Sequence, residues 1–306
     1  MDPNSNEIVR EFPNLFRLYK DGRVERLLGI ETTPAGTDPL TGVQSKDITI
    51  NSETGLAARL YLPPNATTTQ KLPLLVYIHG GAFCVCSPYN TGYHHHLNTV
   101  SAQANIVVFS IHYRLAPEHP LPVAYDDTWE AIQWISKATD PWLADHADLN
   151  IVFFAGDSAG GNLSHNMAMR GATEGFGSLK LQGIVLLHPF FGNEEKDELL
   201  EFLYPSYGGL NDPKIHAAND PNLSSLGCGK VLVFVAGKDF LRERGRTYYD
   251  ALKKSGWSGA VEMVETEGEG HVFHLFDPTK EKSVALVQQF ISFITQTAKD
   301  VNSASS

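Results

Sequence analysis

A serine between two glycines is the feature of this sequence with the clearest chemical meaning. The segment GDSAGGN, residues 156–162, places Ser158 in a Gly-x-Ser-x-Gly pattern, after the apolar run IVFFA and before the helix-favouring stretch NLSHNMAMRGA. The flanking glycines allow a sharp turn from which the serine hydroxyl stands clear, and the following helix directs unpaired N–H groups to the same point. The segment therefore predicts a nucleophilic serine, with Asp157 supporting the turn.

A serine hydroxyl needs a base, and the base needs a group that orients it. Asp239 directly follows the apolar run at 230–237, and His271 lies in the loop-like segment GEGHVFH at 268–274. The chain order Ser158, Asp239, His271 is one of the known orders of a serine catalytic triad. We expect His274, three residues later, to fall on another side of the loop.

The negative charge that forms on a carbonyl oxygen during attack also needs hydrogen-bond donors. The segment HGGAF at 79–83 ends the apolar run LLVYI. We expect the N–H groups of Gly80, Gly81 and Ala159 to form this oxyanion hole, and the ring of His79 to hold the loop by a hydrogen bond.

Apolar residues beside these segments are candidates for a substrate pocket, with ordinary packing as the alternative for each. An aromatic pocket would favour small acyl esters of hydrophobic alcohols over peptides or phosphates. The candidates are Phe83, Tyr89, Phe190, Phe191, Phe240, Leu241 and Val272.

The elements that must position these residues alternate along the chain. Apolar or β-branched runs begin near residues 47, 57, 72, 105, 150, 181, 230 and 259, and helical periods are expected near 93–104, 122–138, 159–172, 243–255 and 280–297. This alternation predicts an α/β fold with a mostly parallel central sheet flanked by helices, one domain over 1–306. Catalytic residues are then expected at the carboxyl ends of the strands. The stretch 1–45 is outside the alternation and could form part of a cap, and 299–306 is expected to be a disordered tail.

Composition excludes several other classes of function. The 306 residues carry a formal charge of −11 and are 42% hydrophobic. A negative chain is a poor partner for nucleic acid or an anionic membrane surface. No secretory h-region precedes residue 20 and the number of cysteines is 3, which favours the cytoplasm. We expect no cofactor and no metal: His94, His95 and His96 are adjacent, and side chains adjacent on a helix diverge. The sequence leaves monomer and homodimer open.

Five motifs together resemble one family. HGGAF at 79–83, YRLAPEHPLPVAYDD at 113–127, GDSAGGN at 156–162, GKD at 237–239 and GEGHVF at 268–273 are similar to motifs of the plant carboxylesterases, in the hormone-sensitive-lipase-like group of the α/β-hydrolase superfamily. The resemblance implies the α/β-hydrolase fold, the triad Ser158, Asp239 and His271, the oxyanion donors Gly80, Gly81 and Ala159, and a small helical cap from about 1–45 and 190–215.

Two departures from the family and two other functions accompany this resemblance. Ala82 stands where the family often has a third glycine, and the stretch 192–213 is shorter than is usual, which bears on pocket size. The same group includes dehydratases and cyclases of specialised metabolism, such as alkaloid or isoflavonoid metabolism, and the gibberellin receptor, which lacks the catalytic histidine. Because His271 is present, hydrolysis is the main expectation, an elimination or cyclisation is the alternative, and a hormone-binding protein is a third.

Overall fold

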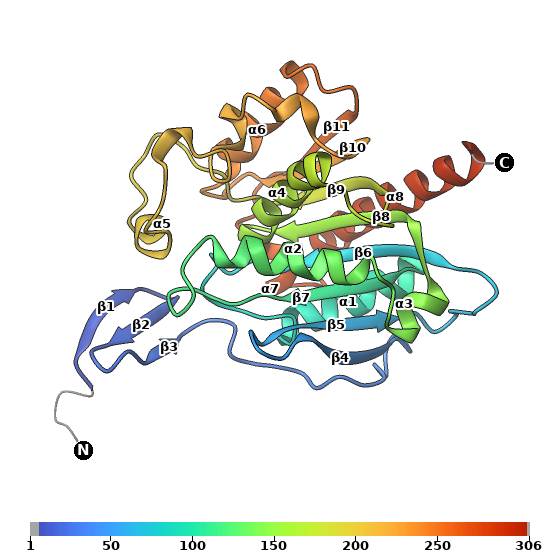
Figure 1. Ribbon diagram of the computed structural model, residues 1–306, viewed down its shortest axis with the longest axis horizontal. Coiled ribbons are helices and arrows are strands. Elements are labelled where there is room, and N and C mark those ends of the chain that lie inside the picture. Colours follow the sequence, from blue (N-terminus) through green and yellow to red (C-terminus); the bar gives the residue numbers. More distant parts are fainter. Residues whose placement is uncertain (1–5, 305–306) are drawn as a thin grey trace.

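The computed structural model describes residues 6–304 and has an eight-stranded sheet at its centre, in the order β11-β10-β9-β8-β6-β7-β5-β4 (Figure 1). Strands β6 to β11 are parallel, whereas β5 pairs antiparallel with β7 and β4 antiparallel with β5. The central strands are largely apolar because helices cover both faces of the sheet. The strands are β4 (Gln44–Asn51), β5 (Leu56–Leu62), β6 (Leu72–Ile78), β7 (Val107–His112), β8 (Ala147–Asp157), β9 (Leu181–Leu187), β10 (Lys230–Ala236) and β11 (Ala260–Thr266).

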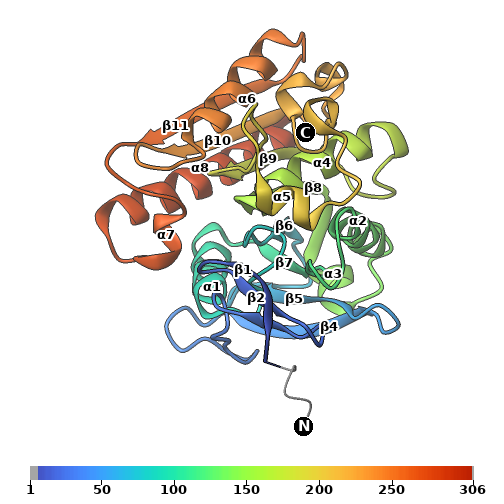
Figure 2. The ribbon, with the colours of Figure 1, turned by 90° about the vertical axis from the view of Figure 1, so that its left-hand side faces the viewer.

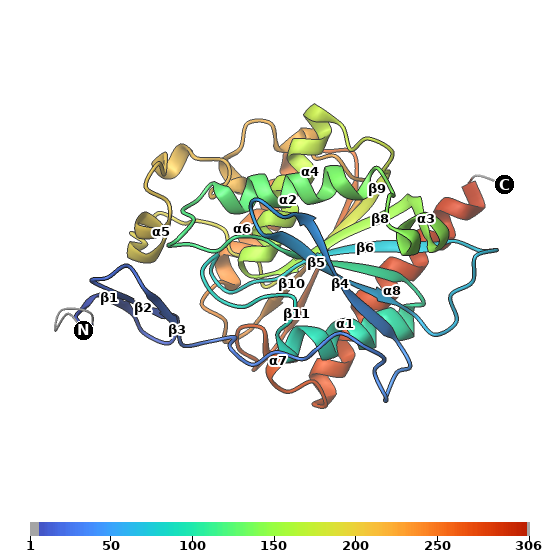
Figure 3. The same ribbon diagram turned by 60° about the horizontal axis from the view of Figure 1, so that its bottom comes forward.

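Helices form a layer on each face of this sheet (Figure 3). α1 (Thr91–Ala104) and α8 (Glu281–Ala304) cover one face, and α2 (Val123–Ile135), α4 (Ala159–Glu174) and α6 (Arg242–Lys254) cover the other. Two short helices, α3 (Pro141–His146) and α7 (Phe273–Phe276), precede β8 and α8.

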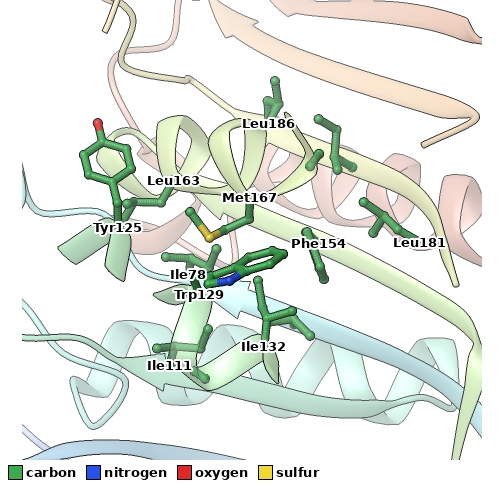
Figure 4. Packing of buried hydrophobic residues seen from close by; sticks show 14 of the residues in the cluster. Ile78, Ile111, Tyr125, Trp129, Ile132, Phe154, Leu163, Met167, Leu181 and Leu186 are labelled. Atoms are coloured by element: carbon green, nitrogen blue, oxygen red, sulfur yellow. The ribbon is translucent and has the colours of Figure 1, made fainter. Parts of the chain in front are cut away.

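Each face of the sheet has its own hydrophobic core. Because side chains alternate along a strand, Phe154 of β8 points to the α2 and α4 side, and Phe153 to the α1 and α8 side. Figure 4 shows Trp129 of α2 beside Phe154, in the same cluster as Met167 of α4. Full burial of a side chain of this size stabilises the fold by about 1.5–3 kcal/mol. The sheet is therefore a rigid base for the loops at its edges.

Two distant parts of the chain meet over the carboxyl ends of the parallel strands and form a cap (Figure 2). The first is a three-stranded antiparallel sheet of β1 (Ile8–Phe12), β2 (Phe16–Tyr19) and β3 (Val24–Arg26). The second contains α5 (Glu198–Leu203) and the 3-10 turns η1 (Gly209–Asn211), η2 (Ala217–Asn219) and η3 (Leu223–Ser225). The ring of Phe202 lies 5.4 Å from that of Phe12 and 6.3 Å from that of Phe16, which joins the two parts.

Arg26 fastens the first part of the cap to the body. Its Nε donates to the carbonyl of Cys84 at 2.8 Å, and its two terminal nitrogens donate to the carboxylate of Glu118 at 2.8 and 2.9 Å. Such a bidentate contact fixes the orientation of the guanidinium group as well as its distance from the carboxylate. The cap is thereby held beside the loop that follows β6.

The predicted α/β architecture is confirmed, and the predicted helices and strands occur within a few residues of their expected positions. Two details differ. The first part of the cap is a small sheet where a helical cap was expected, because its alternating residues place Phe12 and Phe16 against α5. The expected disordered tail also differs, since α8 continues to Ala304; residues 305–306 lie outside the described residues.

Candidate active site

Ser158 occupies a strained turn between β8 and α4. Its backbone angles are φ 52° and ψ −119°, a conformation that costs a non-glycine residue about 1–3 kcal/mol. The backbone around it is crowded: a Cβ added at Gly160 would lie 1.9 Å from the carbonyl oxygen of Ile78. A Cβ at Gly156 would lie 2.4 Å from the carbonyl oxygen of Gly160. The two glycines are therefore required by the close approach of β6, β8 and α4, which together hold the serine in place.

Asp239 and His271 form a hydrogen-bonded pair. Asp239 lies just beyond β10, its side chain is 1% exposed, and its Oδ2 is 2.8 Å from Nδ1 of His271. The other oxygen, Oδ1, accepts from the N–H of Leu241 at 2.8 Å. An ionised carboxylate only accepts hydrogen bonds, so His271 carries a proton on Nδ1 and presents Nε2 as a free base.

The charge of Asp239 is stabilised by these contacts. Burial acts to raise the pKa of the Asp239 carboxyl group. The hydrogen bond from His271, the charge on that ring and the hydrogen bond from the Leu241 N–H act to lower it, and the resulting pKa is below the ordinary value. Asp239 therefore stays ionised and can hold the imidazole in one tautomer.

Ser158 and His271 line the same cavity, which has a volume of about 800 Å³. Among residues 6–304, no hydrogen bond joins the serine hydroxyl to the imidazole ring, whose side chain is 23% exposed. Contacts between a nucleophile and its base are often longer before substrate binds. The fold thus brings the three residues predicted for the triad to one place, with the pair Asp239 and His271 already in contact.

The backbone N–H of Gly80 is engaged elsewhere, contrary to the expectation for the oxyanion hole. It donates to Oδ1 of Asp157 at 3.1 Å and to the hydroxyl of Tyr93 at 3.0 Å, both in the buried interior. Within the described part of the chain, the N–H groups of Gly81, Ala82 and Ala159 have no recorded acceptor, and Gly81 and Ala82 line the cavity. The Gly80 N–H is therefore not free to act as the expected donor, and the N–H of Ala82 is a further candidate for that role.

Asp157 organises this loop from below. It is fully buried, and it accepts hydrogen bonds from the hydroxyls of Tyr77 and Tyr93 at 2.9 and 2.8 Å as well as from Gly80. Burial raises the pKa of its carboxyl group, although the two phenols and the nearby His271 act in the opposite direction. The expectation that Asp157 supports the turn agrees with these contacts. His79 also agrees with its expected role, since its Nδ1 lies 2.8 Å from the carbonyl of Gly80 and its ring stacks on Tyr113 at 4.3 Å.

The candidate pocket residues divide into two groups. Five of them line the cavity: Phe83, Phe190, Phe240, Leu241 and Val272. Tyr89 instead packs on His112, with ring centroids 5.0 Å apart, and Phe191 is buried against Tyr248 at 4.5 Å. Neither side chain lines the cavity: Tyr89 lies in the loop before α1, and Phe191 lies in the segment that follows β9.

The cap supplies most of the lining that the sequence did not indicate. Leucines from the segments around β2, β3 and α5 complete the wall, and Ile30, Phe240 and Phe276 stand at the mouth with exposed fractions of 68%, 74% and 70%. The six leucines lie within the two segments expected to form the cap, 1–45 and 190–215, but no local motif marks them individually as parts of a site. They are Leu15, Leu27, Leu28, Leu199, Leu200 and Leu203.

One group of side chains could offer ligands to a metal ion. Ring nitrogens of His188 and His271 and a carboxylate oxygen of Asp239 lie within 4.8 Å of one another. However, Nδ1 of His271 already donates to Asp239, and Nδ1 of His188 accepts from the N–H of Val272 at 3.1 Å. A metal ion bound through either of these nitrogens would displace the hydrogen bond that it makes. His188 was not among the predicted site residues, because its segment, LLHPF, shows no motif of its own.

The fold and this arrangement define a class of protein. Residues 75–275 match the family described as alpha/beta hydrolase fold, and the chain belongs to that family. It is 44% identical to probable carboxylesterase 2 of Arabidopsis thaliana, over 97% of this chain and 99% of that protein. It is 45% identical to 2-hydroxyisoflavanone dehydratase of Glycyrrhiza echinata, over 95% of this chain and 97% of that protein. The resemblance to plant carboxylesterases is thereby confirmed.

A solved structure supports the same class. The esterase of the hyperthermophilic archaeon Pyrobaculum calidifontis superposes with a TM-score of 0.71 at 29% identity, over 83% of this chain and 86% of that one. Among the described residues, no helix has the length and apolar character needed to cross a membrane.

Proposed function

We propose that this protein is a serine carboxylesterase that hydrolyses small acyl esters of hydrophobic alcohols. The observation that carries the proposal is the placement of Ser158 and the hydrogen-bonded pair Asp239 and His271 on one largely apolar cavity. The similarity to a probable carboxylesterase supports the same reaction.

The reaction follows from the roles of these groups. Nε2 of His271 takes the proton of Ser158, whose oxygen attacks the ester carbonyl carbon. The N–H groups of Gly81, Ala82 and Ala159 hold the negative charge that develops on the carbonyl oxygen. Protonated His271 then gives its proton to the departing alcohol, which leaves an acyl group on Ser158. A water molecule, activated by the same ring, releases the acid and restores the serine.

Asp239 assists without losing its charge. It holds His271 with the Nδ1 proton toward itself, and it stabilises the imidazolium that forms in each half of the reaction. Its lowered pKa keeps it ionised over the pH range in which an ester hydrolase works.

The charges of the cavity favour neutral or cationic substrates. Among the described residues that line it, Glu31, Asp157 and Asp197 are acidic, and none is a lysine or an arginine. A carboxylate on the substrate would lose hydration there without gaining a positive partner. We expect an aryl acetate to be turned over at least about tenfold more efficiently than its hemisuccinate analogue, a difference of about 1.4 kcal/mol.

The main test combines turnover with covalent labelling. The wild-type protein should hydrolyse p-nitrophenyl acetate and take up one equivalent of a serine-directed organophosphate, whereas Ser158→Ala should do neither. Loss of a triad member costs orders of magnitude in rate. A Ser158→Ala variant that keeps more than about a tenth of the wild-type rate would contradict the proposal.

A second candidate is an elimination of water, and one finding favours it specifically. The chain is 45% identical to a protein named 2-hydroxyisoflavanone dehydratase. In such a reaction His271 would move a proton, and the N–H groups of the oxyanion loop would bind a carbonyl oxygen. Labelling of Ser158 without measurable ester turnover would favour this candidate, and absence of both would favour a binding protein. A cytoplasmic location stays a prediction.

A further inference from the structure

His188 is a buried residue whose ring makes one hydrogen bond within residues 6–304, to the loop that carries His271. It directly follows β9, has φ 48°, and is 1% exposed. Its backbone N–H donates to the carbonyl of Phe234 in β10 at 2.9 Å, which continues the pairing of β9 with β10 by one residue. Its Nδ1 accepts a hydrogen bond from the N–H of Val272 at 3.1 Å. Within residues 6–304, Nε2 of the same ring has no partner.

The residue that His188 binds is itself in an unfavourable conformation. Val272, next to His271, has φ 44° and ψ 34°, in the left-handed region that β-branched residues rarely adopt. This turn leads from the loop into α7, and it sets the direction in which the His271 ring leaves the backbone. A turn of this kind persists only where surrounding contacts hold it. The hydrogen bond to His188 is such a contact.

His188 lies beside both Asp239 and His271. Its ring centroid is 6.0 Å from that of His271. One of its ring nitrogens lies within 4.8 Å of a ring nitrogen of His271 and of a carboxylate oxygen of Asp239. His274 is the other imidazole that faces it, at 5.8 Å between centroids. An acceptor at Nδ1 requires the neutral ring to carry its proton on Nε2.

Burial keeps this ring neutral. Burial, helped by the charge on His271 and opposed by the carboxylate of Asp239, lowers the pKa of His188 to about 3. His188 therefore remains a hydrogen-bond acceptor at any pH at which the enzyme would work, and it adds no positive charge beside His271 when that ring is protonated.

We propose that His188 is a positioning residue: by accepting the N–H of Val272 it holds the turn that directs His271 toward Ser158. The role in catalysis rests on the proposed function, whereas the role in orienting His271 does not. A purely structural role predicts that any side chain of similar size at this buried position would serve equally well.

The test compares two substitutions that differ in one acceptor. In His188→Asn, the amide oxygen occupies about the place of Nδ1 and can still accept from Val272. His188→Leu fills similar space and cannot accept. His274→Leu is the matched control, because His274 is equally buried and both of its ring nitrogens lack a partner in the described part of the chain.

We expect His188→Leu to lower kcat on p-nitrophenyl acetate at least a hundredfold with little change in KM. His188→Asn should remain within tenfold of the wild type, and His274→Leu within about threefold. The low-field NMR resonance of the proton between His271 and Asp239 should be lost or broadened in His188→Leu alone. This signal needs no substrate, so it reports on the positioning even if the protein proves not to hydrolyse esters.

Two results would overturn the proposal. One is a His188→Leu variant with wild-type kcat and an unchanged NMR resonance. The other is equal loss of activity and of thermal stability in all three variants, since that pattern would mean that burial alone, and not the acceptor, is required.

Discussion

Asp157 offers a sharp test of how the loop around the candidate oxyanion donors is held. The carboxylate is fully buried, and it accepts from the hydroxyls of Tyr77 and Tyr93 and from the N–H of Gly80. The perturbation is Asp157→Ala, which removes the acceptor while leaving the three donors in place.

The expected loss of unfolding free energy depends on which of the three donors still has an acceptor after the substitution. Gly80 still has the hydroxyl oxygen of Tyr93 at 3.0 Å, so the two phenols are the groups left without an acceptor. An unsatisfied buried donor costs about 1–3 kcal/mol, which gives about 2–6 kcal/mol for the pair. Removing the carboxylate also removes the cost of burying it. We therefore expect Asp157→Ala to lower the free energy of unfolding by about 2–4 kcal/mol. Asp157→Asn keeps one acceptor oxygen and should lose about 1–2 kcal/mol.

The assay is urea denaturation followed by tryptophan fluorescence, with ester turnover measured on the same samples. The midpoint should fall in the order wild type, Asp157→Asn, Asp157→Ala at an unchanged m value, and turnover of the alanine variant should drop at least tenfold as the Gly80 loop shifts. Asp145→Ala removes an exposed carboxylate and should stay within about 0.5 kcal/mol of the wild type. An Asp157→Ala midpoint equal to that of this control, with turnover intact, would refute the reasoning.

Three further predictions concern neighbouring positions. Gly80→Ala should abolish soluble expression or activity, because the added Cβ would lie 2.3 Å from Oδ2 of Asp157 and 2.7 Å from its carbonyl oxygen. Ala82→Gly should retain turnover and raise stability by up to about 1 kcal/mol in thermal melts, because φ 51° costs alanine about 1–2 kcal/mol and the greater freedom of unfolded glycine offsets part of it. The pKa of Asp239 is lowered on folding, so its contribution to stability is complete above about pH 5 and is lost progressively as the pH falls from its ordinary value near 3.8 to the lower pKa of the folded state. Asp239→Asn should flatten that part of a plot of urea midpoint against pH, and an unchanged slope would show that His271 does not stabilise the charged form.

Much of the fold could be predicted because its signals are local. A strand buried on both faces reads as a continuous apolar run, and β6, β8 and β10 all do so. The turn at Ser158 could be predicted for a similar reason: Gly156 and Gly160 are the residues that a close approach of three backbones demands, and they stand beside the serine in the sequence.

The sequence by itself therefore determined the strands of the central sheet, its long flanking helices, their order along the chain, and three candidate catalytic positions, two of them directly after strands. Each of these depends on a residue's own conformational preference or on that of its immediate neighbours. Parallel strands bring their carboxyl ends to one edge of the sheet, so residues that follow different strands were expected to meet there.

Only the tertiary structure decided which backbone amides are free and what encloses the cavity. The N–H of Gly80 is occupied by groups 13 and 77 residues away in the chain, and no local pattern encodes such a partner. The two parts of the cap are joined by the contact between Phe12 and Phe202, which are far apart in the chain, and the turn beside His271 is held by a histidine that comes 84 residues before Val272. These contacts join residues that are distant in the sequence. They are selected by packing and exist only once the whole chain has folded.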